Sequence, residues 1–287
     1  MRALLNTLFV LSEDSYLSLD GENVVVNRSK EESARFPLHT LEGILTFAYA
    51  GVSPALMGAC AHRGVDLAFF TPRGRFLART VGETRGNVLL RQAQYRASDS
   101  PYESVRMAKG FILGKIYNAR WVLERATRDH PMRVPVEDIK RLSSQLATAL
   151  ASVETCETYG ELLGLEGVGI DPYVGFLHRP RPGRSSLALD MMEELRCICA
   201  DRFVLSCINQ RILTAEHCRH QESGAVLLTD EGRRAFLSAW QKRRQETLTH
   251  PFLGEKIAWG LVPYVQALLL ARTLRGDLER YPPFFWK

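Results

Sequence analysis

Apolar and polar positions divide the chain into two regions that meet near Gly86. Before Gly86 the apolar residues form short runs separated by turn signals, a pattern typical of β-strands. Asp20-Gly21 indicates a hairpin turn, and Ser53-Pro54 begins a short helix that ends near Arg63. The strands expected from these runs are residues 3–10, 16–19, 23–26, 36–39, 43–49, 65–70 and 75–81.

After Gly86 the apolar positions recur with the period of an α-helix. Ser100 and Pro101 provide an N-cap and a first helical residue for a long helix that runs through Arg128. The other expected helices are residues 136–153, a helix containing Asp190, residues 229–250 and residues 254–275. The pattern predicts an α+β protein, with a small N-terminal β domain (residues 1–85) followed by a larger all-α domain (residues 86–287), and the candidate residues described below make the second the expected catalytic domain.

Composition places the chain among globular proteins. The 287 residues include enough apolar side chains for a substantial core. The N-terminus shows no secretory cleavage site, and the longest apolar stretch, residues 257–271, is too short and interrupted to span a bilayer. The six cysteines are then expected to be reduced thiols in a cytoplasmic protein with no membrane partner. The aromatic tail, residues 281–287, should dock on the body of the protein.

The positive charge is concentrated in one part of the chain. The net charge is +5, and residues 86–150 alone carry eleven Lys and Arg against six Asp and Glu. A basic helical segment of this kind suits the phosphates of nucleic acid, although an ordinary solvated helix surface would have the same composition. The candidate phosphate-binding residues are Arg91, Arg96, Lys109, Lys115 and Arg120.

The candidate chemistry lies around one histidine and one carboxylate-rich helix. Asp190, Glu193 and Glu194 have the i, i+3, i+4 spacing that places side chains on one helical face. Carboxylates on a mostly apolar helix need a cationic partner. With the imidazole of His178 they suit Mg²⁺ or Mn²⁺. The simpler alternative is a solvated face that pairs with Arg196 or Arg202.

Other residues near this helix allow further interpretations. The loop arginines Arg179, Arg181 and Arg184 suit phosphate, although arginines in loops are as often merely solvated. A zinc site is a weaker alternative, because its spacing fits no standard zinc knuckle and buried apolar thiols explain the cysteines equally well. That alternative would use Cys197, Cys199, Cys207, His217, Cys218 and His220.

The chain as a whole resembles the CRISPR-associated integrase family, the metal-dependent endonuclease and integrase of spacer acquisition. The resemblance extends from Met1 to Lys287, and its C-terminal motifs are similar to the type I-C branch. The motifs that carry it are Ser53-Pro54-Ala55-Leu56-Met57, Gly82-Glu83-Thr84-Arg85-Gly86-Asn87-Val88, Asp171-Pro172-Tyr173-Val174-Gly175-Phe176-Leu177-His178, Ser186-Leu187-Ala188-Leu189-Asp190, Thr249-His250-Pro251 and Pro282-Pro283-Phe284.

The resemblance implies a ligand set that the residues alone do not identify. In the family a glutamate, a histidine and a second acid bind the metal, and these match Glu166, His178 and Glu193. Asp190, one helical turn before Glu193, is then a neighbouring carboxylate that supports the ligands. Only the Gly-x-Glu-Gly turn of the family distinguishes Glu166 from the other acidic residues around it.

The chain departs from the family pattern at one point. A stretch containing a helix, a basic loop and a second helix is absent between Gly167 and Val168. Either the protein has lost this stretch or the sequence as written omits a mobile segment. We predict the omission, in which case these two Cα atoms would not lie about 3.8 Å apart as in a continuous chain.

The resemblance also implies a reaction and partners. The 3′-hydroxyl of a short captured duplex, the prespacer, would attack a phosphodiester at the edge of a CRISPR repeat, or water would cleave branched DNA. The implied partners are double-stranded DNA, a second copy of the chain bound through the β domain, a small ferredoxin-like protein and an iron–sulfur exonuclease. A genuine deletion would favour the alternative of a DNA-binding scaffold without competent catalysis.

Overall fold

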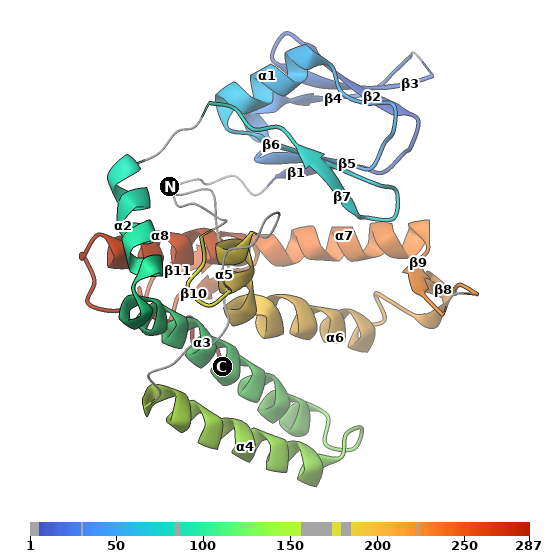
Figure 1. The fold of residues 1–287 in the computed structure, drawn as a ribbon. Coiled ribbons are helices and arrows are strands. Elements are labelled where there is room, and N and C mark those ends of the chain that lie inside the picture. Colours follow the sequence, from blue (N-terminus) through green and yellow to red (C-terminus); the bar gives the residue numbers. More distant parts are fainter. Residues whose placement is uncertain (1–5, 30, 84–86, 156–173, 179–184, 223) are drawn as a thin grey trace. The chain divides into compact units, whose positions relative to one another are not determined.

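The computed structural model describes residues 6–29, 31–83, 87–155, 174–178, 185–222 and 224–287. It contains two compact units (Figure 1). The β unit comprises residues 1–85 together with 215–245, and the helical unit comprises residues 86–214 together with 246–287. The assignment of residues 1–85 to dimerisation and of 86–287 to catalysis remains a prediction.

The β unit contains two sheets. In the first, β1 (Thr7–Val10), β5 (Gly43–Thr46) and β6 (Asp66–Phe70) are parallel, and β7 (Phe76–Arg79) pairs antiparallel with β6. The second is an antiparallel meander of β2 (Ser15–Asp20), β3 (Asn23–Arg28) and β4 (Glu31–Pro37). The hairpin predicted at Asp20-Gly21 is confirmed, and β6 and β7 form a second hairpin around Pro72-Arg73-Gly74.

Helix α1 (Pro54–Arg63) supplies the core shared by the two sheets. Its N-cap is confirmed, because Ser53 Oγ accepts a hydrogen bond from Leu56 N at 3.2 Å. Leu56 and Cys60 are buried against side chains of both sheets. The strand predicted over residues 36–39 was wrong in part, since β4 ends at Pro37 and the 3-10 helix η1 (Leu38–Thr40) follows.

A later segment of the sequence completes the β unit. Helix α7 (Asp230–Gln245) contacts the start of β1, where Gln241 Nε2 donates to Thr7 O at 3.1 Å. Its neighbour Arg244 forms a 2.7 Å ion pair with Glu42. The short ribbon of β8 (Cys218–His220) and β9 (Val226–Leu228) precedes this helix. The helix predicted over residues 229–250 therefore ends too late, because β10 (Thr247–Thr249) follows it.

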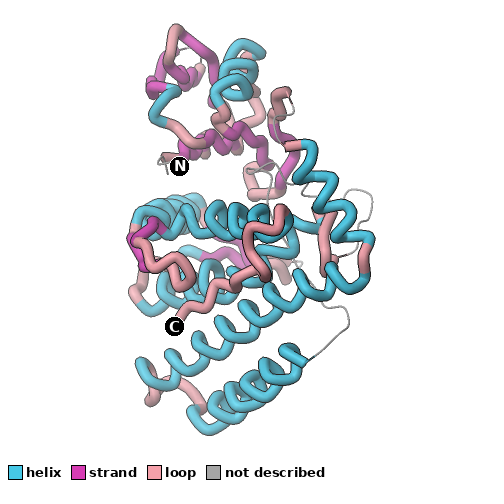
Figure 2. Tube along the Cα trace, turned by 90° about the vertical axis from the view of Figure 1, so that its left-hand side faces the viewer, coloured by secondary structure: helices cyan, strands magenta, loops and turns pink. Residues whose placement is uncertain are grey.

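The helical unit is built on one long helix, α3 (Pro101–Asp129). Its predicted cap is confirmed, since Ser100 Oγ accepts from Glu103 N. Helix α4 (Val136–Thr155) packs along α3, and both views show the two side by side (Figure 1 and Figure 2). Helix α2 (Val88–Asp99), which the sequence pattern did not separate, precedes α3 and begins after the Asn87 cap.

The remaining elements of this unit converge on the other side of α3. They are α5 (Ser186–Arg196), the π-helical turn η2 (Cys197–Asp201), α6 (Arg202–Asn209), the β10–β11 ribbon with β11 at Lys256–Ala258, and α8 (Val262–Leu274). The helix predicted over 254–275 was wrong at its start, which is strand β11. The unit is therefore mainly helical rather than all-α, and the α+β order of the chain is confirmed.

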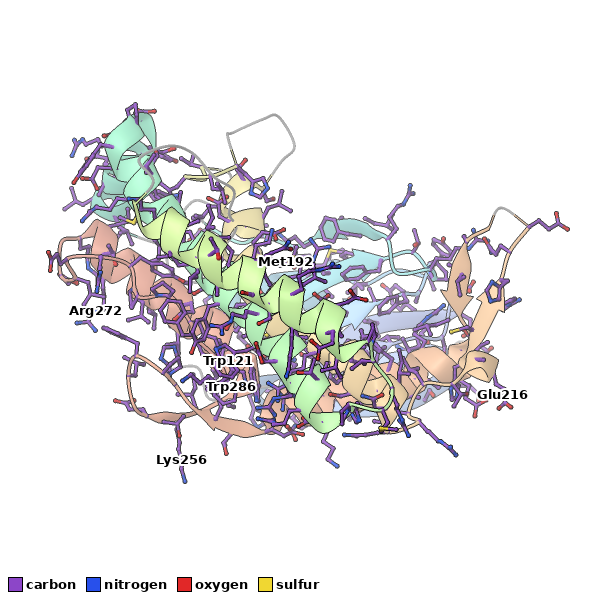
Figure 3. The ribbon with its side chains drawn as sticks, turned by 90° about the horizontal axis from the view of Figure 1, so that it is seen from below. Trp121, Met192, Glu216, Lys256, Arg272 and Trp286 are labelled. Atoms are coloured by element: carbon purple, nitrogen blue, oxygen red, sulfur yellow. The ribbon has the colours of Figure 1, made fainter. Side chains whose placement is uncertain are left out.

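The C-terminal tail docks on α3, as predicted. Asn118 on α3 donates to Phe284 O at 2.8 Å and accepts from Trp286 N at 2.9 Å. Trp286 of the tail and Trp121 of α3 are labelled in Figure 3. Tyr281 and Phe284 are almost fully buried. Two glycines make room for this packing: an added Cβ would lie 2.7 Å from the Tyr281 ring at Gly110 and 2.6 Å from Glu194 Cγ at Gly114.

No helix in the described parts of the chain is both long and apolar enough to cross a membrane.

Candidate metal centre

The turn that carries His178 is held by a buried carboxylate. Asp190 on α5 is fully buried, and its Oδ2 accepts from Phe176 N at 2.7 Å and from Leu177 N at 3.3 Å. Its Oδ1 accepts from His178 N at 2.9 Å and lies 3.0 Å from Nδ1 of the same residue. One carboxylate thus fixes both the backbone of the turn and the imidazole.

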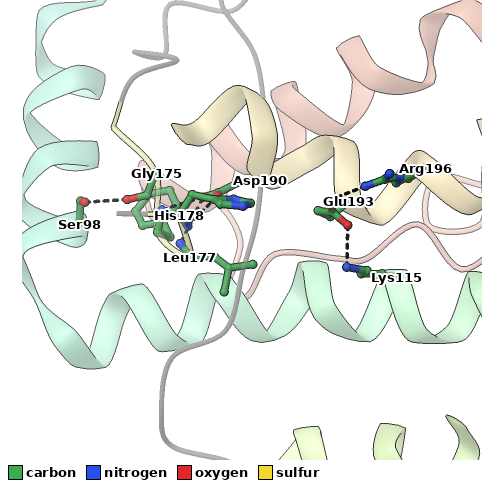
Figure 4. Close-up of polar contacts among 9 residues, drawn as sticks. Ser98, Lys115, Gly175, Leu177, His178, Asp190, Glu193 and Arg196 are labelled. Carbon is green, nitrogen blue, oxygen red and sulfur yellow. Dashed lines mark hydrogen bonds and ion pairs between the residues drawn. The ribbon is translucent and has the colours of Figure 1, made fainter. Parts of the chain in front are cut away.

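The opposite edge of the same turn is held by helix α2. Gln94 Nε2 donates to Val174 O at 2.7 Å, and Ser98 Oγ donates to Gly175 O at 2.8 Å (Figure 4). A side chain at Gly175 would meet Asp190 Oδ2 at 2.9 Å, so the carboxylate can approach only because this residue is glycine. The turn is therefore bound through its N–H groups by α5 and through its carbonyls by α2.

Glu193 lies one helical turn after Asp190 and faces two cations. Lys115 Nζ on α3 is 2.6 Å from Glu193 Oε2, and Arg196 is 3.3 Å from Oε1 (Figure 4). The lysine ammonium is the charged partner of Oε2, which is otherwise buried without a hydrogen-bond donor. Burial alone would raise the pKa of Glu193, but Lys115 and Arg196 bring it below the ordinary value.

The types of these residues suit a divalent cation, and their role as its ligands remains a prediction. Asp190 accepts the proton of His178 Nδ1 in the tautomer in which Nε2 is the unprotonated nitrogen, and this carboxylate–histidine arrangement is common behind metal-bound imidazoles. The ionised Glu193 would supply a hard oxygen. Within the described residues no three His, Cys, Asp or Glu side chains lie together as a metal site, so His178, Asp190 and Glu193 do not form such a group by themselves.

The predicted ligand Glu166 lies outside the described residues, as do the loop arginines Arg179, Arg181 and Arg184 and the junction Gly167–Val168. Their predicted roles remain predictions. For the zinc alternative, the cysteines and histidines among the described residues form no metal-binding cluster. Burial raises the pKa of the Cys197 thiol to about 11, which suits an apolar packing role.

Most of the candidate phosphate-binding residues are not fully exposed to solvent. Among the five predicted, only Arg96 is exposed, whereas Lys115 pairs with Glu193 and Arg120 donates to Ser143 Oγ at 3.3 Å. The sequence count could not separate solvent-facing charges from those that contact other helices. Exposed cations in the same segment include Arg133 and Lys140.

The sequence pattern grouped Glu194 with the metal-facing acids, but the structure separates it from them. Glu194 is fully buried, and its carboxylate accepts from Tyr281 Oη at 2.6 Å, from Gln266 Nε2 at 3.2 Å and from Phe284 N. The carboxylate therefore ties α5 to α8 and to the C-terminal tail. No local pattern indicated this role, because all three partners come from more than 70 residues away.

Glu194 makes folding stability depend on pH. Burial raises its pKa from 4.5 to about 7, although the hydrogen bonds from Tyr281, Phe284 and Gln266 oppose this. Between these values the folded protein binds more protons than the unfolded chain, so stability should fall as pH rises from about 4.5 to about 7. In a Glu194→Gln variant the free energy of unfolding should not show this decline, which amounts to roughly 3 kcal/mol in the wild type.

Urea unfolding of both proteins at pH 5 and pH 7.5, in the presence of a chelator, measures the difference. Glu255, an exposed acid, gives a matched control as Glu255→Gln. If the variant and the wild type lose the same stability between the two pH values, Glu194 is not the group responsible.

The family comparison places the chain among CRISPR proteins. The sequence model described as CRISPR associated protein Cas1 matches residues 8–168 and 165–242. The CRISPR-associated endonuclease Cas1 1 of Chlorobaculum tepidum is 40% identical, and Cas1 2 of Rhodospirillum rubrum is 42% identical, each over 100% of both chains. A Geobacter sulfurreducens fusion of exonuclease Cas4 and endonuclease Cas1 is 28% identical over 96% of this chain and 60% of its own length.

The same comparisons locate the interruption. The alignment with the Chlorobaculum relative spans 343 positions, 56 more than this chain has residues, so at least that many positions lack a counterpart here. The two segments matched by the family model meet at residues 165–168. The interruption therefore coincides with the predicted ligand Glu166.

A solved structure supports the fold. The Cas1 protein from Thermotoga maritima has a TM-score of 0.72 at 14% identity, covering 98% of this chain and 99% of its own. At this identity the likeness concerns the fold alone, whereas the sequence relatives extend over whole chains. The resemblance read from the motifs is confirmed at this level, and the chain belongs to the Cas1 family of CRISPR-associated endonucleases.

Proposed function

We propose that this Cas1 endonuclease and integrase of spacer acquisition holds Mg²⁺ or Mn²⁺ through His178, Glu193 and Glu166. The family is typically metal-dependent. The observation that carries the proposal is the double role of Asp190, which binds both the turn and the imidazole of His178 one helical turn from Glu193. A buried carboxylate of this kind fixes the tautomer and the orientation of the imidazole, as carboxylates commonly do behind metal-bound histidines.

The chemistry follows from the donor set. A bound divalent cation would polarise the scissile phosphate and stabilise its developing charge. His178 supplies a neutral nitrogen, and Glu193 supplies a carboxylate that Lys115 and Arg196 keep ionised. The 3′-hydroxyl of the prespacer would form a new P–O bond at the repeat edge, while the bond from the phosphorus to the original 3′-oxygen breaks. The attacking hydroxyl loses its proton to solvent, and the leaving oxygen takes up a proton from solvent. Water in place of the hydroxyl gives hydrolysis.

The metal-dependent reaction is testable with purified protein, a short duplex and a plasmid that carries a CRISPR repeat. Joining of the duplex 3′-end to the repeat should require Mg²⁺ or Mn²⁺ and should stop on chelation. The Cas2 partner is supplied in the same assay. Joining that continues unchanged in excess chelator would overturn the proposal.

The DNA phosphates have two groups of candidate partners. The loop arginines Arg179, Arg181 and Arg184 follow His178 directly in the sequence. The exposed cations Arg96, Arg133 and Lys140 lie on the helical unit. Both groups would bind duplex DNA without sequence choice, because arginine and lysine bind phosphates rather than bases in this role.

We also assign the homodimer contact to the edge of the β unit. Strand β7 is the last strand of its sheet, and all four of its residues are exposed, with Phe76 at 54% and Leu77 at 47%. An exposed apolar edge strand is a template for pairing with another chain. A Leu77→Lys variant should therefore sediment as a monomer where the wild type is a dimer, and Arg75→Lys serves as a control. Wild-type protein that stays monomeric at micromolar concentration would contradict the assignment.

The proposal also includes partners, a CRISPR subtype and a location in the cell. Cas1 proteins assemble with Cas2 and DNA, and a relative is fused to Cas4. We therefore propose the small ferredoxin-like Cas2 and the iron–sulfur exonuclease Cas4 as partners. The motifs Thr249-His250-Pro251 and Pro282-Pro283-Phe284 support a type I-C system. We propose the CRISPR array as the substrate. The protein would then act in antiviral defence in the cytoplasm.

The scaffold alternative has one observation in its favour, the interruption at residues 165–168. If the chain lacks these positions in the cell, it would bind Cas2 and DNA but would not join DNA ends. Mass spectrometry of the native protein separates the two cases, since a longer protein would contain the missing positions. A native mass equal to that of the 287-residue chain, together with absent joining, would favour the scaffold.

A further inference from the structure

Lys115 occupies the position at Glu193 that a metal ion would need. It lies on α3, on a different element from the candidate ligands, and its Nζ is 2.6 Å from Glu193 Oε2. The glutamate side chain is 12% exposed and the lysine 41% exposed. Arg196 approaches the other oxygen at 3.3 Å and is more exposed, at 58%. The closest cation at the glutamate is therefore the lysine ammonium.

The ammonium and a divalent cation exclude one another at this oxygen. Mg²⁺ binds carboxylate oxygen at about 2.0–2.1 Å, and an ammonium held 2.6 Å from the same atom would lie against it with like charge. Glu193 Oε2 has no hydrogen-bond donor that would otherwise hold it. One of the two cations must leave before the other can bind.

We propose that Lys115 is the internal cation of the metal-free site, which releases Glu193 when a divalent cation binds and then contacts the DNA phosphodiester. This inference rests on the proposed function, in which Glu193 is a ligand. A lysine suits both positions, because its ammonium is a mobile point charge on a four-carbon stem. Its partial exposure leaves space for the side chain to swing outward. The released ammonium remains next to the place where the anionic substrate arrives.

The two roles predict changes of opposite direction in a Lys115→Met variant. Without the competing ammonium, Mn²⁺ should bind more tightly, by about tenfold, because a like charge next to the cation has been removed. Joining of DNA ends at saturating Mn²⁺ should instead fall by about tenfold or more, because a phosphate contact has been lost. A lysine that only supports the fold would weaken both.

Titration calorimetry and the electron paramagnetic resonance of Mn²⁺ measure binding to the metal-free protein, and the duplex-joining assay measures turnover. Lys115→Arg keeps the charge and should retain wild-type metal affinity within about threefold. Lys256→Met removes an exposed lysine of the same unit, on β11, and should change neither measurement. Lys115→Gln is a second uncharged variant, used if the methionine form does not give the wild-type circular dichroism spectrum.

The outcomes separate this inference from the proposed function. If wild-type protein does not bind Mn²⁺, or if Glu193→Gln binds it as well as wild type, the metal assignment itself fails and the inference falls with it. If binding depends on Glu193 but the uncharged variants Lys115→Met and Lys115→Gln bind Mn²⁺ equally or more weakly than wild type, the exchange is wrong while the metal site stands. Tighter binding with unimpaired joining overturns the phosphate contact.

Discussion

His178→Ala and Glu193→Ala variants are expected to lose DNA joining and cleavage while remaining folded. Each removes one direct metal ligand of the proposed site. The loss should exceed about a hundredfold, since removing even an outer partner of a metal ligand costs about 10- to 100-fold. The fold should survive, because both side chains lie at the edge of the core with 12% exposure. Joining assays and thermal unfolding of each variant test both halves of the prediction.

Asp190 gives the matched comparison on the same helix. Its alanine variant leaves three backbone N–H groups of the histidine turn without an acceptor, and each such group costs about 1–3 kcal/mol when buried. Asp190→Ala should therefore be less stable than either ligand variant, while Asp190→Asn keeps an acceptor oxygen and should be milder. An active Glu193→Ala beside a dead but fully stable Asp190→Ala would show that the ligand has been assigned one turn too late.

Removal of the tail from Tyr281 onward is expected to unfold the helical unit. Tyr281 packs on Phe111 with ring centroids 4.3 Å apart, and Phe284 is completely buried. Loss of one large aromatic side chain from a core costs about 3–5 kcal/mol, which is a large share of a typical stability of 5–15 kcal/mol. The truncation also leaves Glu194 and Asn118 buried with missing partners. Thermal unfolding followed by circular dichroism measures the loss.

Two neighbouring phenylalanines provide the control for this prediction. Phe284→Ala should lower the melting temperature strongly, whereas Phe285→Ala should lower it less, because Phe285 is 37% exposed and contacts chiefly Tyr117. A truncated chain that melts with the wild type would mean that the tail merely rests on α3. It would also remove the explanation offered for the buried carboxylate of Glu194.

Local signals in the sequence predicted the elements that local physics determines. Ser53 and Ser100 cap helices as expected, and Asp20-Gly21 turns a hairpin, with Gly21 at φ 56°. Local signals could not predict which strands pair. Strand β5 pairs with β1 although it lies more than thirty residues later, and no adjacent turn identifies the partner of a parallel strand. The same holds for α7, whose contacts with Thr7 and Glu42 join distant parts of the chain.

The sequence predicted the types of residue in the candidate site, but it did not predict which partner each side chain contacts. Spacing placed Asp190, Glu193 and Glu194 on one face, and that geometry suggested a common role. The three carboxylates instead face a backbone turn, a lysine and a tyrosine. Side chains three or four positions apart on one helical face can still contact different elements of the fold. Gln94 and Ser98 were missed for the same reason, since their targets are backbone carbonyls of a remote turn.

The two glycines of α3 set a limit on how this protein can be engineered. Alanine is normally a safe replacement for glycine within a helix, with a gain of about 1 kcal/mol in helix propensity. At Gly110 and Gly114 the new methyl group would instead occupy space taken by Tyr281 and Glu194. A stabilisation programme guided by helix propensity would thus choose these two positions first and damage the protein there. The composition of α3 is dictated by what lies against it, and redesign must treat the helix and the tail as one unit.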